Sequence, residues 1–103
     1  MTDKVIEEIH ASLQALNRAA ELATGQEQIE IREQQQALFQ RLDRWMFERT
    51  GKVSGDVDSA IALLKDQQQV AAQAEEGLSD HVKLLVISKK VVEAIDKILD
   101  VVS

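Results

Sequence analysis

Residues 84–102 read LLVISKKVVEAIDKILDVV, and the spacing within this stretch indicates the fold. Mostly apolar residues recur at alternating intervals of four and three, at Leu84, Ser88, Val91, Ile95, Ile98 and Val102. Side chains at such intervals share one face of an α-helix, so this heptad repeat is typical of helices that pack at shallow angles. Alternating intervals of three and four also occur in three earlier segments, from Ile6, Ile31 and Val57 onward. The chain therefore contains four segments that favour packed helices.

Glycines separate these segments, because glycine is poorly suited to a helix interior and the chain has no proline. They stand at Gly25, Gly51, Gly55 and Gly77. The predicted helices cover approximately residues 3–24, 27–50, 56–76 and 79–102. Helices of similar length with short connections predict an all-α, antiparallel, up-down-up-down four-helix bundle.

Two local alternatives stay open at this point. The sequence around Gly25 is compatible with a turn or with a kink. A kink would join the first two helices into one long rod, and paired helical hairpins in a homodimer would then be needed to bury its apolar stripe. Residues 82–92 are rich in β-branched side chains and could form a strand. The helix is favoured there, because no other segment offers a partner strand.

Composition excludes several classes of protein. The chain has 103 residues, 45% of them hydrophobic, which suits one globular domain over residues 1–103. Its net charge of −6 argues against general binding to nucleic acids or anionic membranes. There is no cysteine, and the longest aliphatic run, residues 84–87, is too short to span a bilayer. The first residues lack the pattern of a signal peptide, so we expect a cytoplasmic protein.

No residue pattern predicts catalysis, a metal site or a cofactor. His10 and His81 are expected at opposite ends of the bundle, and neither begins a metal-binding motif. The residues that follow each histidine also differ from those of histidine phosphotransfer domains. The long, acid-rich helices are unlike the short basic recognition helices of DNA-binding proteins. We therefore expect a protein that is not an enzyme.

Glutamines form a candidate polar layer in the bundle. If the second and third helices form a hairpin, residues whose numbers sum to about 103 face each other, so Gln35 meets Gln68. The same register places Ser88 in this layer. One interpretation is that these glutamines are solvated, as most glutamines are. The other is a buried, hydrogen-bonded layer, which costs stability but specifies register and oligomeric state.

Two stretches contain more apolar residues than one helix face can bury. Trp45, Met46 and Phe47 are consecutive and fan over about 200° of a helix. Residues 84–87 likewise surround most of their helix. Part of this surface should therefore face a partner, unless residues 52–55 cover Phe47. The candidate partner-binding residues are Phe39, Trp45, Met46 and Phe47, with Leu85, Val86 and Val92 as a second surface.

The sequence therefore predicts a non-enzymatic helical protein–protein interaction module, such as an adaptor, a small chaperone or a regulatory subunit. Its partner would be a second copy, as a homodimer, or another helical protein. The alternative is a bundle that binds a small apolar or lipid-like ligand between its helices. Such a ligand would need a pocket among Trp45, Ile9 and Ile95.

Overall fold

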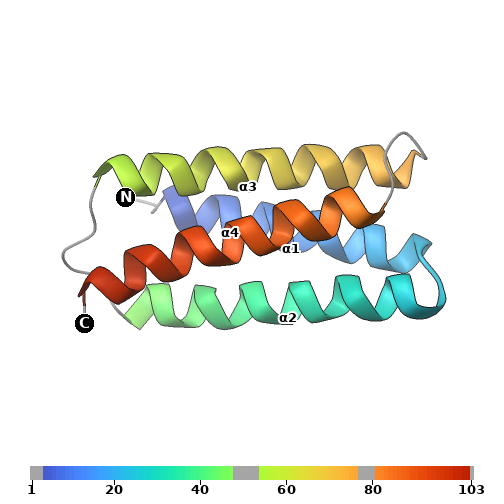
Figure 1. Ribbon diagram of the computed structural model, residues 1–103, viewed down its shortest axis with the longest axis horizontal. Coiled ribbons are helices and arrows are strands. Elements are labelled where there is room, and N and C mark those ends of the chain that lie inside the picture. The colour runs from blue at the N-terminus through green and yellow to red at the C-terminus, as the bar shows by residue number, and fades with distance from the viewer. Residues whose placement is uncertain (1–3, 48–53, 77–80, 103) are drawn as a thin grey trace.

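Four α-helices account for almost all of the described chain in the computed structural model (Figure 1). The described residues are 4–47, 54–76 and 81–102, and the side chains of residues 54 and 100–102 are not among them. The helices are α1 (Lys4–Leu22), α2 (Gly25–Phe47), α3 (Ser54–Glu75) and α4 (His81–Val102). The predicted all-α, four-helix class is confirmed. The strand considered for residues 82–92 is wrong, because these residues belong to α4.

The helix limits lie within two residues of the expected ones wherever the two can be compared. Helix α1 ends at Leu22, α2 begins at Gly25 and α3 begins at Ser54. The expected start of the first helix at residue 3, end of the second at residue 50 and start of the fourth at residue 79 lie outside the described residues.

The chain turns back at Gly25, so the kink considered there is excluded. Gly25 has a φ of 62°, in the left-handed region that glycine adopts without steric cost. The backbone amide of Ala23 donates to the carbonyl oxygens of Ala19 and Ala20, at 3.1 and 3.2 Å. These bonds give partners to two carbonyl groups in the last turn of α1. Helix α2 then packs against α1, and one chain supplies all four helices of the bundle.

Consecutive helices run in opposite directions, but not every consecutive pair is in contact (Figure 1). Helix α1 packs against α2 and α3, and α4 packs against the same two helices. The bidentate pair of Arg41 with Asp96, with N–O distances of 3.0 and 3.1 Å, joins α2 to α4. Over the described residues, α2 and α3 are therefore diagonal to each other, as are α1 and α4.

This arrangement corrects the register predicted for the second and third helices. Gln35 does not face Gln68 across a hairpin, because α2 and α3 are not neighbours. Six residues separate Phe47 from Ser54, whereas two separate Leu22 from Gly25. An extended chain of six residues spans about 20 Å. Neighbouring helices 8–10 Å apart give a diagonal of roughly 11–14 Å, which a segment of this length can cross.

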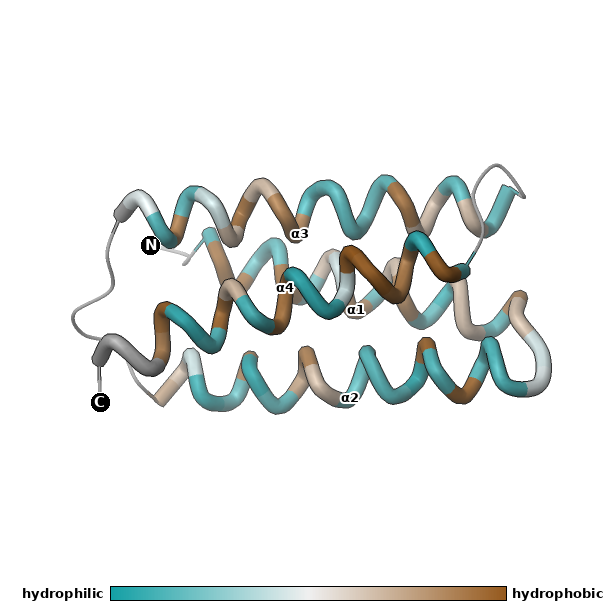
Figure 2. The backbone as a smooth tube through the Cα atoms, in the orientation of Figure 1, coloured by the Kyte–Doolittle hydropathy of each residue, from teal (hydrophilic) through white to brown (hydrophobic). Residues whose placement is uncertain are grey.

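Apolar side chains from all four helices fill the centre of the bundle. The residues with 2% or less of their surface exposed include Val5, Ile9, Leu16, Ala20, Ile31, Leu38, Trp45, Ala60, Leu64, Ala71, Leu84, Val91, Ile95, Ile98 and Leu99. In α1 the buried face is rotated from the predicted stripe, since Val5 and Ser12 are buried while Ile6 and Leu13 are partly exposed. The rotation follows from the two neighbours of α1, because its buried face points between α2 and α3. Figure 2 shows the contrast between the mostly hydrophilic α2 and the hydrophobic start of α4.

Candidate functional site

The three consecutive apolar residues near the end of α2 have very different surroundings. Trp45 is 2% exposed and belongs to the core, so its prediction as a partner-binding residue is wrong. Met46 is 44% exposed and Phe47 is 89% exposed. Phe47 lies about 200° around the helix from Trp45 and points away from the bundle. The alternative that residues 52–55 cover Phe47 involves residues outside the described ranges.

Phe39 adds a second aromatic side chain to the surface of α2. It is 53% exposed and borders a groove of about 320 Å³ that Leu13, Arg32, Gln35 and Gln36 also line. Leu13 belongs to α1, so this groove runs along the contact between α1 and α2. One further apolar side chain of α2, Ile29, is 52% exposed. We call Ile29, Phe39, Met46 and Phe47 the apolar outer residues of α2.

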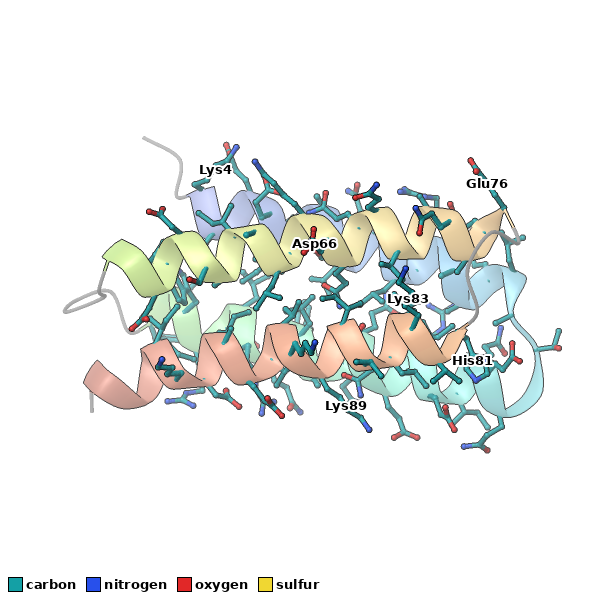
Figure 3. The ribbon with its side chains drawn as sticks, turned by 45° about the horizontal axis from the view of Figure 1, so that its top comes forward. Lys4, Asp66, Glu76, His81, Lys83 and Lys89 are labelled. Carbon is teal, nitrogen blue, oxygen red and sulfur yellow. The ribbon has the colours of Figure 1, made fainter. Side chains whose placement is uncertain are left out.

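The second predicted surface, on α4, is less apolar in the structure. Val86 is half-exposed, whereas Leu85 and Val92 are partly buried. A groove of about 370 Å³ separates the outer sides of α3 and α4, and Val86 borders it. Its lining mixes apolar Val70 and Ile87 with charged Asp66 and Lys83. Figure 3 shows Lys83 between the two helices and Asp66 on α3.

A polar layer lies inside the bundle, and its buried glutamine is Gln67. Ser12, Gln67 and Ser88 each have at most 1% of their surface exposed. The side-chain amide of Gln67 donates to the hydroxyl oxygen of Ser88 at 2.8 Å, and the hydroxyl of Ser12 donates to the carbonyl oxygen of Leu64 at 3.1 Å. The amide oxygen Oε1 of Gln67 is buried without a hydrogen-bond partner. Ser88 therefore lies in a buried layer, while the two predicted glutamines do not.

Gln35 and Gln68 are only partly buried, and each binds across a helix pair at the edge of the core. Gln35 donates to the carbonyl oxygen of Leu13 at 3.5 Å and accepts from Arg32 at 2.9 Å. Gln68 donates to Oε1 of Glu8 at 2.9 Å. This hydrogen bond is the main reason that the pKa of Glu8 lies below its ordinary value of 4.5. The two glutamines connect α1 to α2 and α1 to α3.

The described side chains next to Trp45 pack closely in the core. Ile9 and Ile95 are completely buried and pack in the same core as Trp45. These three side chains leave almost no accessible surface, so the described residues form no ligand-sized pocket among them. The pocket expected among these three residues is therefore absent.

The described residues contain no group of three or more His, Asp or Glu side chains that could hold a metal ion. His81, at the start of α4, lies with Nδ1 3.2 Å from Oε1 of Glu27, near the turn between α1 and α2 (Figure 3). His10 is exposed on α1. None of the four described helices is both long and apolar enough to cross a membrane.

Comparison with protein families, curated proteins and solved structures finds no match to this chain. Sequence reasoning missed Ser12, Gln67 and Ile29. The position of Ile29 could have been noticed, because it precedes Phe47 by 18 residues, or five whole helical turns.

Proposed function

We propose that this protein is a non-enzymatic helical interaction module that binds another protein through the exposed side of α2. The observation that carries the proposal is the exposure of three apolar side chains in the second half of α2, Phe47 at 89%, Phe39 at 53% and Met46 at 44%. Single exposed apolar residues are common on protein surfaces. Two aromatic side chains and a methionine within three turns of one helix form a larger apolar surface, of the kind that marks interaction sites.

The chemistry of these side chains also supports binding. Aromatic residues supply much of the energy at protein interfaces, and methionine adapts its shape to a partner. The groove beside Phe39 offers a recess of about 320 Å³ for a partner's side chain. Adaptors, small chaperones and regulatory subunits all act through such surfaces without catalytic groups.

We propose a cytoplasmic location as well, supported by the cysteine-free sequence.

The experiment compares captured proteins between the wild type and a surface variant. The variant carries Phe39→Ser and Phe47→Ser, and the matched control carries Val82→Ser, which alters a 56% exposed side chain on α4. Each protein is immobilised and incubated with an extract of the source cells, and the retained proteins are quantified by mass spectrometry. We expect the double variant to lose at least one protein that the wild type and the control retain. Retention of the same proteins in the same amounts would contradict the proposal.

A further inference from the structure

The outward side of α2 carries a nearly palindromic pattern of side chains. Ile29 and Phe47 lie at its two ends, about 27 Å apart on one face of the helix. Going inward from each end, an arginine follows after two residues, at Arg32 and Arg44. The next residue on each side is acidic, and a glutamine follows after two more, at Gln36 and Gln40. All of these side chains are exposed. The surface therefore has an approximate two-fold symmetry centred near residue 38.

We propose that this side of α2 pairs in antiparallel orientation with α2 of a second copy of the chain. The proposal rests on the proposed function and names a partner for the part of that surface that carries Phe47. In this pairing, residues whose numbers sum to about 76 lie at the same height along the helices. Phe47 of each copy then meets Ile29 of the other, and Gln36 meets Gln40. A symmetric pair of helices makes each of these contacts twice.

The charged residues of this surface are complementary to the same residues of a second copy. At a rotation of 100° per residue, Arg32 and Asp43 lie on one flank of the outward face, and Glu33 and Arg44 lie on the other. A two-fold axis perpendicular to the plane of the two helices brings equivalent flanks together. Arg32 of each copy then lies beside Asp43 of the other, and Glu33 lies beside Arg44. The pairing therefore forms four interchain ion pairs.

Two observations favour a second copy as the occupant of this surface. The four charged residues sum to zero, although the whole chain has a net charge of −6. Two copies therefore approach each other here without the repulsion that their net charges cause elsewhere. In addition, neither Glu33 nor Asp43 has an ion pair or side-chain hydrogen bond within the described part of the chain. The antiparallel orientation is further favoured because it opposes the two helix dipoles.

One helix face is smaller than the surface of about 800 Å² that each partner buries in a standard interface. We therefore expect a dimer that dissociates on dilution. Light scattering behind a sizing column should give a mass near 11.5 kDa at low concentration, rising toward twice that value at high concentration.

Charge reversal tests the surface. One chain carries Arg32→Glu and Arg44→Glu, and a second carries Glu33→Arg and Asp43→Arg. Each variant alone should dimerise roughly tenfold or more weakly than the wild type, because like charges now face each other. An equimolar mixture should regain the dimer mass, because an acidic face then meets a basic one. Circular dichroism checks that each variant is folded, and recovery in the mixture is a result that a merely unfolded variant would not give.

Cross-linking tests the orientation, and the absence of native cysteine makes its background low. One chain carries Glu33→Cys and a second carries Asp43→Cys. In the antiparallel pair the two introduced thiols lie at the same height, on either side of the contact line between the helices and within reach of a short linker, whereas identical positions of two copies lie about 15 Å apart along the helices. A short bismaleimide should therefore link the mixture and not either variant alone. Gln69→Cys, on the exposed side of α3, is the control and should not form dimers.

The results separate this proposal from the proposed function. A wild type that stays monomeric, or a dimer that neither charge reversal weakens, overturns self-pairing through α2. Cross-linking within each single variant but not between them overturns the antiparallel arrangement. The proposed function would survive these results if the Phe39 and Phe47 variant still lost a different protein in the capture experiment.

Discussion

The two sides of α2 differ sharply in how much of their aromatic side chains is exposed. Trp45, on the inner side, is 2% exposed, and Phe47, two residues later, is 89% exposed. Both residues are large and aromatic, so hydrophobicity alone does not explain their placement. Their difference teaches that the rotation of α2 about its own axis decides which aromatic side chain stabilises the fold and which is available to a partner.

The largest effect should come from truncating the two aromatic residues one at a time. Trp45→Ala removes a buried side chain and should lower the free energy of unfolding by about 3–5 kcal/mol. Phe47→Ala should change it by no more than about 0.5 kcal/mol, because the side chain is already in solvent. Urea unfolding followed by circular dichroism measures both values. Similar losses for the two variants would contradict the assigned rotation of α2.

The buried polar layer provides the next contrast between inside and outside. Ser88→Ala removes the hydroxyl oxygen that accepts from the side-chain amide of Gln67, and should lower the free energy of unfolding by about 1–3 kcal/mol. The amide N–H would then be buried without a partner, as Oε1 of Gln67 already is. Adding Gln67→Met should recover most of this loss, because both polar groups are then gone. Ser59→Ala, at an exposed serine of α3, is the control and should have little effect. A double variant less stable than Ser88→Ala would exclude this account.

The turn at Gly25 positions α2, and alanine substitutions at Gly25 and Gly55 should change the stability in opposite directions. Gly25→Ala should cost about 1–2 kcal/mol, because alanine is strained at a φ of 62°. Gly55→Ala should instead stabilise the protein by up to about 1 kcal/mol. It lies in α3 without a positive φ, and its added methyl group would meet no atom within 4 Å. Thermal unfolding of both variants checks the prediction. Destabilisation by both substitutions, or by neither, would be inconsistent with these conformations.

The smallest effect should be a pH dependence at the edge of the core. Because the pKa of Glu8 is lowered in the folded chain, its contribution to stability is present above the ordinary value of 4.5 and is lost as the pH falls below it. Gln68→Met removes the hydrogen bond that mainly lowers this pKa, so the variant should lose less stability on acidification from about pH 6 to about pH 3. Urea unfolding at several pH values tests this, with the exposed Gln69→Met as control. An equal acid-induced loss in all three proteins would refute it.

Much of the fold was predictable because helix formation depends on local sequence. The glycine positions and the intervals of three and four predicted four helices, and every one is present. The three consecutive apolar residues near the end of α2 predicted that at least one of them is exposed, since one helix face cannot bury them all. The three residues alone did not predict which of them is exposed, because side chains spread over about 200° allow more than one rotation.

The register of the polar layer was not predictable from the same intervals. Gln67 and Gln68 are adjacent, and a rotation of about 100° exchanges their surroundings. Gln68 is a candidate for the buried layer in the sequence because a hairpin of the second and third helices would pair it with Gln35. The structure instead places α1 and α4 beside α3, and the side of α3 that faces α4 carries Gln67.

The sequence by itself determined that this chain forms four amphipathic helices of similar length, carries no cysteine and has more apolar surface than one stripe per helix can bury. Only the tertiary structure decided that α2 and α3 lie diagonally, that Trp45 points inward and that Gln67 belongs to the core. The physical reason is the range of the interactions. Helix periodicity arises between residues three and four apart, whereas the rotation of each helix is set by contacts with neighbours that the sequence does not name.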